Sequence, residues 1–166
     1  MRPAAGFTLL ELLVVASLIA ILSATAVIGL RSVGADPLAR EANRLVAVWN
    51  ALCEESAQDA RPLGLSLAAT AWQGVQPGRD RQWRGTPGPA YAVHDLPSGM
   101  RIELVDAGAD AQPGDSLASE PQLLCLPGGL SQGPDVRLST ADSSLTIEVD
   151  PDSGGRRLAG GADVRR

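Results

Sequence analysis

The sequence contains no lysine: all 14 of its basic residues are arginine, and 19 acidic residues outnumber them. The resulting net charge of -5 makes general binding to nucleic acid or to anionic lipid surfaces unfavourable. Two cysteines are too few for a disulfide-rich scaffold. Together with a single histidine, they also exclude a zinc site of the common four-ligand type. That one histidine, His94, narrows the hydrolase mechanisms open to the chain.

The chain has 166 residues, of which 45% are hydrophobic and only 3% are aromatic. This length supports one domain of ordinary size with a modest core. It does not support two sizeable domains in addition to a membrane segment.

The hydrophobic residues are concentrated near the N-terminus, where the run from Leu12 to Leu30 contains no charge. As a helix this run would reach about 28 Å, which is close to the thickness of a bilayer's hydrocarbon core. Arg2 and the initiator amine favour a cytoplasmic leader. We therefore expect one membrane-spanning segment, with the rest of the chain on the periplasmic or exterior side.

A secretory signal peptide and a simple membrane anchor are the two plain alternatives for this segment. The signal peptide would use Leu12–Leu22 as its apolar region and Ala24–Ala26 as its cleavage motif. Neither alternative explains Glu11, which stands within the apolar segment. A carboxylate deep in a membrane helix costs about 2.5–3.5 kcal/mol on insertion scales, and it is rarely without a function.

The residues Gly6-Phe7-Thr8-Leu9-Leu10-Glu11, followed by an apolar run, resemble the signal of type IV pilins and type II secretion pseudopilins. The resemblance implies that a prepilin peptidase cuts after Gly6 and methylates Phe7. It also implies that Glu11 meets the new N-terminal amine of a neighbouring subunit in a fibre. Two unit charges 4 Å apart interact by about 4 kcal/mol at an effective dielectric of 20, so the pair would set the register between subunits.

Beyond the apolar run, the sequence predicts one amphipathic helix followed by strands. Asp36 is suited to cap a helix that starts at Pro37, and Pro62 ends it. A helical stripe consists of Leu38, Ala42, Leu45, Trp49 and Leu52. Alternation at 63–67, 101–104 and 145–149 predicts half-buried antiparallel strands, and 122–126 resembles a central strand. Residues 73–89 and 106–121 lack periodicity and are expected to be functional or mobile loops.

These elements predict an α+β fold in which a long N-terminal helix packs on an antiparallel β-sheet or β-sandwich. Its first half would span the membrane, and its second half would be amphipathic. The expected segments are a leader (1–6), a transmembrane and fibre-core helix (7–30), an amphipathic helix (31–61) and a periplasmic β-rich domain (62–166).

The globular part resembles the GspH/FimT family of minor pseudopilins and minor pilins. The resemblance rests on Glu54–Leu67, Leu96–Leu104, Leu124–Gly133 and Leu145–Arg157. It implies a non-enzymatic subunit without a cofactor in the periplasmic pseudopilus of the type II secretion system. The partners implied are the major pseudopilin, other minor pseudopilins, the prepilin peptidase and the inner-membrane platform. A FimT-like minor pilin that binds DNA for transformation is the alternative.

Several local patterns carry weaker functional signals. Gly114–Leu117 spells a GDSL hydrolase signature. In that family the catalytic histidine follows the serine in the sequence, whereas His94 precedes Ser116. His94 is therefore expected to be a surface or turn residue. Asp150–Gly155 resembles a calcium loop but lacks the required later ligands, so a solvated turn is expected. Cys53 and Cys125 are expected either as buried thiols or as a disulfide.

Two groups of arginines remain. One surrounds Trp83 and comprises Arg79, Arg81 and Arg84; the other lies in the tail and comprises Arg156, Arg157, Arg165 and Arg166. Either group could bind phosphate or stack on a base. The acidic balance of the chain favours solvated arginines and no binding of nucleic acid.

Overall fold

The structure, a computed structural model, describes residue 13 and residues 36–108, 111–151 and 156–159. A compact unit begins at Pro37. Its helix, α2 (Pro37–Asp59), is followed by strands only, as the sequence predicts. The order of the elements confirms the α+β class, whereas the expected membrane-spanning half of the helix lies outside the described residues.

The larger sheet has the strand order β3-β2-β1-β6-β7, and β4 pairs with β2 beside β3. Its neighbouring strands are antiparallel. Its members are β1 (Leu63–Ala68), β2 (Ala71–Pro77), β3 (Trp83–Gly85), β4 (His94–Asp95), β6 (Leu123–Cys125) and β7 (Ser131–Gln132).

The smaller sheet has the antiparallel order β10-β9-β8-β5. Its members are β5 (Arg101–Leu104), β8 (Val136–Ser139), β9 (Ser144–Val149) and β10 (Arg156–Ala159). In β5 and β8 the buried residues alternate with more exposed ones, which is the pattern of strands with one face toward the core.

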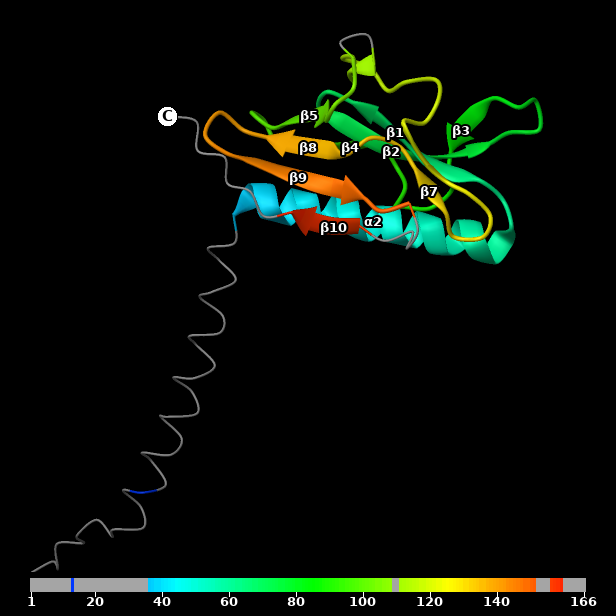
Figure 1. The fold of residues 1–166 in the computed structure, drawn as a ribbon, viewed down its shortest axis with the longest axis horizontal. Coiled ribbons are helices and arrows are strands. Elements are labelled where there is room, and N and C mark those ends of the chain that lie inside the picture. The colour runs from blue at the N-terminus through cyan, green and yellow to red at the C-terminus, as the bar shows by residue number, and fades with distance from the viewer. Residues whose placement is uncertain (1–12, 14–35, 109–110, 152–155, 160–166) are drawn as a thin grey trace, which may run out of the picture. The chain divides into compact units, whose positions relative to one another are not determined.

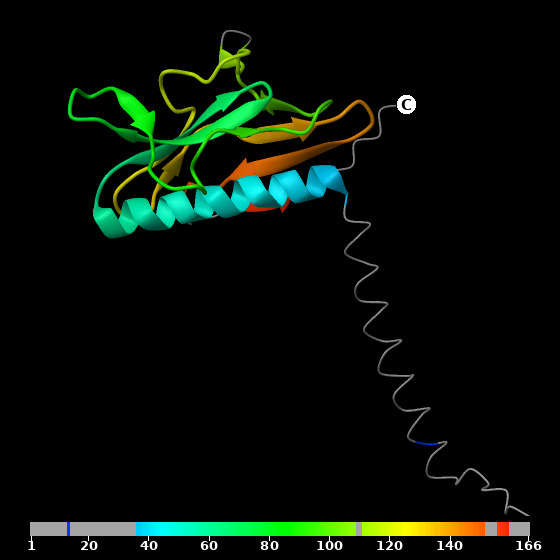
Figure 2. The ribbon, with the colours of Figure 1, turned by 180° about the vertical axis from the view of Figure 1, so that it is seen from behind.

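The helix α2 lies against both sheets, touching β1 and β6 of the larger sheet and β8, β9 and β10 of the smaller one (Figures 1 and 2). All five residues of the predicted apolar stripe are buried in the shared core. Each sheet contributes apolar side chains to this core, among them Leu63, Leu65, Trp72, Ile102, Leu138 and Ile147. The predicted amphipathic helix therefore covers its own domain.

The first strand departs from the prediction, because β1 is buried along its whole length and not on one face only. Residues 114–121, expected to be part of a functional or mobile loop, lie against it. The Ser66 hydroxyl donates to the Ala118 carbonyl at 2.7 Å, and a Cβ at Gly64 would lie 2.6 Å from Pro121 Cβ. Small residues at alternate positions of β1 therefore let this segment pack on it.

The prediction of a loop over residues 73–89 was wrong in part, because β2 extends to Pro77 and forms a hairpin with β3. In β2 the burial does not alternate, since residues on both faces are covered. A period of two is the sequence signal for a strand with one solvated face, so a strand covered on both sides escapes it.

Candidate functional site

The N-terminal signal that carries the functional prediction, Gly6, Phe7 and Glu11, lies outside the described residues. The apolar run Leu12–Leu30 also lies outside the described residues, except for Leu13. In the part of the chain that is described, no helix is long and apolar enough to cross a membrane.

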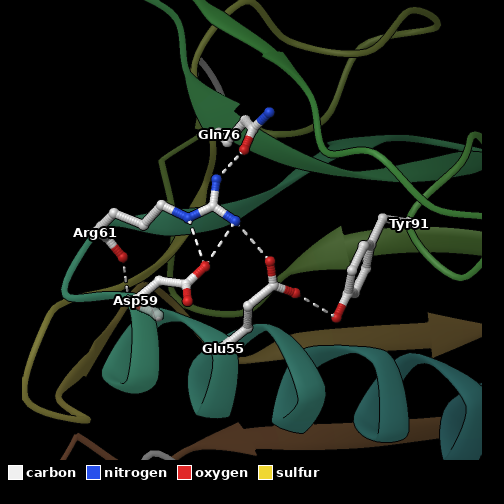
Figure 3. Close-up of polar contacts among 6 residues, drawn as sticks. Glu55, Asp59, Arg61, Gln76 and Tyr91 are labelled. Carbon is white, nitrogen blue, oxygen red and sulfur yellow. Dashed lines mark hydrogen bonds and ion pairs between the residues drawn. The ribbon is translucent and has the colours of Figure 1, made fainter.

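A polar cluster joins the end of α2 to the larger sheet (Figure 3). At its centre, Arg61 follows the helix and precedes β1. Its Nη2 contacts Glu55 Oε1 at 2.6 Å and Asp59 Oδ2 at 3.0 Å, and its Nη1 donates to Gln76 Oε1 on β2. One planar guanidinium thus connects two carboxylates of the helix end with an amide of the sheet, a geometry that lysine could not reproduce.

Tyr91 joins the same cluster from the segment before β4. Its hydroxyl donates to Glu55 Oε2 at 2.9 Å (Figure 3). Burial, followed by the hydrogen bond to Glu55 and its negative charge, raises the pKa of Tyr91 to about 12. The cluster therefore ties the end of α2 to β2 and to the segment before β4.

His94 is not the surface or turn residue that the sequence predicts. It lies on β4, where its side chain is 18% exposed and its Nε2 lies 2.8 Å from Oε2 of Glu41 on α2. Its ring also lies 4.9 Å from the ring of Trp72. The contact joins residues 53 positions apart, so no local pattern could have revealed it.

Cys53 and Cys125 form a disulfide in the structure, with their Cα atoms 5.0 Å apart. The bond joins α2 to β6 within the core, where both residues are buried. Beside it, the Ser56 hydroxyl donates to the carbonyls of Arg61 and Cys125 at 2.7 and 3.0 Å. Of the two alternatives that the sequence leaves open for the cysteines, the structure therefore contains the disulfide.

The hydrolase and metal patterns gain no support from the geometry. Ser116 is exposed on the segment between β5 and β6, and the acidic partner of His94 is Glu41. Asp150 uses its backbone carbonyl to accept a hydrogen bond from Ser131 Oγ, and the rest of its motif, 152–155, lies outside the description. Within the described ranges, no group of three or more His, Cys, Asp or Glu residues could hold a metal ion.

The structure separates the two arginine groups. Arg79, Arg81 and Arg84 lie on or beside the turn of the β2–β3 hairpin, where all three are exposed. In the tail, Arg156 and Arg157 begin β10, and Arg165 and Arg166 lie outside the described residues.

The sequence reasoning missed the polar cluster, although it contains the only tyrosine of the chain. The local signal for it was the acidic side chains Glu55 and Asp59, which lie on the last turns of α2 just before Arg61. Gln76 and Tyr91 are brought to the polar cluster only by the tertiary fold, so no local pattern indicates them.

Comparison with known proteins gives matches to both parts of the chain. Residues 1–27 match the family described as the prokaryotic N-terminal methylation motif. Among solved structures, the minor pseudopilin EpsH of the Vibrio cholerae type 2 secretion system gives a TM-score of 0.60 at 16% identity, covering 75% of this chain and 98% of that one. Escherichia coli GspH gives a TM-score of 0.59 at 20% identity, covering 80% and 98%. These likenesses show the fold.

The family itself follows from a closer sequence relative. Type II secretion system protein H of Aeromonas hydrophila is 31% identical over an alignment of 136 residues, and the match covers 75% of this chain and 74% of that protein. The match is long enough to include most of the globular unit, and the methylation motif accounts for the N-terminus. The chain therefore belongs to the type II secretion system protein H family of minor pseudopilins.

Proposed function

We propose that this chain is a non-enzymatic structural subunit of the periplasmic pseudopilus, which helps to export folded proteins across the outer membrane. Residues 7–30 would form a helix that spans the inner membrane and later lies in the fibre core. The globular unit would face the periplasm. The observation that carries the proposal is the combination, in one chain, of a methylation motif with a domain related to protein H.

The packing of α2 supports the assignment of the fibre contacts to residues 7–30 and not to the globular unit. Its apolar stripe is buried against the two sheets, so it has no apolar face left for a neighbouring subunit. Its outward residues are polar or small, among them Arg40, Asn43, Arg44, Asn50 and Glu54. Apolar contacts between subunits of a fibre would therefore be made by the uncharged run Leu12–Leu30.

Maturation and assembly would use the three N-terminal residues predicted from the sequence. Prepilin peptidase would cut after Gly6 and methylate Phe7, and Glu11 would pair with the N-terminal amine of a neighbouring subunit. The partners would be the major pseudopilin, the other minor pseudopilins and the inner-membrane platform.

Mass spectrometry of the full-length protein purified from its own membranes tests the proposal. We expect a mature N-terminus at Phe7 that carries one additional methyl group. A Gly6→Asp variant should keep residues 1–6 while its globular unit stays folded. A mature protein that starts at Val27 would mean signal-peptide cleavage after Ala26, and the pseudopilin function would be wrong.

A further inference from the structure

The turn between β2 and β3 carries two arginines on a short, tightly bonded loop. Arg79, Asp80 and Arg81 form the loop between Gly78 and Gln82. The Gly78 N–H donates to the Gln82 carbonyl at 2.7 Å, and the Arg81 N–H donates to the Gly78 carbonyl at 3.0 Å. Both ends of the loop are thus fixed by backbone hydrogen bonds.

Asp80 stabilises the loop through contacts of its side chain with Arg84 and Gln82. Its carboxylate pairs with Arg84 Nη2 at 2.7 Å and accepts a hydrogen bond from the Gln82 N–H at 3.3 Å. The pair packs over Gly78, where a Cβ would lie 2.7 Å from Asp80 Oδ1 and 2.9 Å from Arg84 Nε. A side chain at position 78 would therefore displace this ion pair, which balances the charge of Arg84 within the hairpin.

Arg79 and Arg81 differ from Arg84, because neither has an ion-pair partner among the described residues. Both are exposed. Arg81 also adopts a φ of 64°, a left-handed conformation that glycine or asparagine would adopt at lower cost in this kind of hairpin.

The loop lies at a defined end of the domain. Gly64 pairs with Val75, close to the start of β1 and the end of β2, and Arg61 contacts Gln76. The hairpin turn therefore lies at the end of the larger sheet where α2 finishes, opposite the end where the chain enters at Pro37 (Figure 1). Arg79 and Arg81 thus place two unpaired positive charges at one end of the domain, in a chain whose net charge is -5.

We infer that the β2–β3 turn docks on an acidic surface of a neighbouring subunit in the pseudopilus, through Arg79 and Arg81. The inference rests on the proposed function. Guanidinium groups make paired hydrogen bonds with carboxylates, and a fixed loop loses little conformational freedom on docking. Nucleic acid fits less well, because two phosphate contacts contribute little affinity and the acidic body of the chain repels a polyanion.

The test uses the full-length chain in cells that lack the native copy. Its readout is the amount of mature chain that crosslinks to, and is isolated with, the other pseudopilins. The charge-reversed double variant Arg79→Glu/Arg81→Glu should lose association about tenfold or more, because like charges face each other at the contact. Association of the parent should weaken as ionic strength rises.

Two further variants separate docking from stability and from net charge. Arg40→Glu/Arg44→Glu makes the same charge change on exposed residues of α2 at the Pro37 end and should associate as the parent does. Arg81→Gly should melt no lower than the parent, since glycine relieves the left-handed backbone, yet it should associate less.

The outcomes distinguish this inference from the proposed function. If the parent is not processed and never joins the other pseudopilins, the proposed function fails. If the parent joins them and the Arg79→Glu/Arg81→Glu variant joins equally well, or if the Arg40→Glu/Arg44→Glu control loses as much, the docking inference is wrong. A salt-sensitive gel shift of duplex DNA that the Arg79→Glu/Arg81→Glu change abolishes would overturn it in favour of nucleic acid.

Discussion

Tyr91 donates its hydroxyl to one carboxylate oxygen of Glu55, at 2.9 Å, while Arg61 contacts the other oxygen at 2.6 Å. One carboxylate on α2 therefore joins the segment before β4 to the chain between the helix and β1. Arg61 continues the connection to Gln76 on β2. These polar contacts add to the apolar core and the disulfide in fixing the helix end to the larger sheet.

The titration of Tyr91 should reveal this contact directly. Since the chain has one tyrosine, the ultraviolet absorbance of tyrosinate reports on Tyr91 alone. The fold raises the pKa of Tyr91 from its ordinary value of 10.0 to about 12. The neutral hydroxyl is thus the form that the fold favours. Its contribution to stability should be complete below pH 10.0 and be lost as the pH rises toward 12.

Glu55→Gln is the matched variant for this titration. It removes the negative charge beside the hydroxyl but leaves the burial of the ring, which is the larger cause of the shift. We expect the midpoint of the titration to move part of the way back toward the ordinary value. A variant that titrates at the same pH as the parent would contradict the role of Glu55.

The disulfide should make a large contribution to stability, because it closes a loop with a sequence separation of 72. The chain-entropy relation gives about 4 kcal/mol for a loop of this size, and measured values are typically about 2–4 kcal/mol. Chemical unfolding of Cys53→Ser and Cys125→Ser should show this loss in both variants and in the reduced parent. If alkylation without reductant labels two thiols in the folded parent, the disulfide does not form.

The contact between Glu41 and His94 should be energetically coupled, because both side chains are mostly buried, at 15% and 18% exposed. Each of Glu41→Gln and His94→Gln should lower the free energy of unfolding by about 1–3 kcal/mol. A double-mutant cycle should give a coupling energy of about 1 kcal/mol or more.

The ion pair of Asp80 with Arg84 is the control for that cycle. Its side chains are 43% and 64% exposed, so solvent screens the interaction. We expect a smaller coupling energy here than for Glu41 and His94, because water competes for both exposed partners. A larger coupling for the exposed pair than for Glu41 and His94 would mean that burial does not determine the strength of these contacts.

Glu11→Ala should affect assembly and leave insertion and folding intact. Removing the charge makes the apolar run easier to insert, and processing should persist at Gly6. Incorporation beside other pseudopilins should fall, with a loss of about 1–4 kcal/mol of paired-charge energy. Crosslinking to other pseudopilins, compared with N-terminal processing of the same sample, measures both steps. A variant that is neither inserted nor cut, with normal assembly of any processed fraction, would show that Glu11 does not set the register.

The amino-acid sequence by itself determined the features that depend on local periodicity. The stripe of Leu38, Ala42, Leu45, Trp49 and Leu52 is buried as predicted, and alternation identified β5. Both follow from fixed geometry, since a helix repeats every 3.6 residues and a strand every two. The resemblance of the N-terminal motif likewise led to the family, because a short and specific signal needs no tertiary contact to be recognised.

The tertiary structure alone decided the contacts between distant positions. It joined Cys53 to Cys125, brought His94 to Glu41 and gathered Gln76 and Tyr91 around the helix end. It also covered β1 on its second face with residues that looked like a loop. Such contacts depend on how strands and helix are arranged in space, and the local pattern of one segment contains no information about which other segment will cover it.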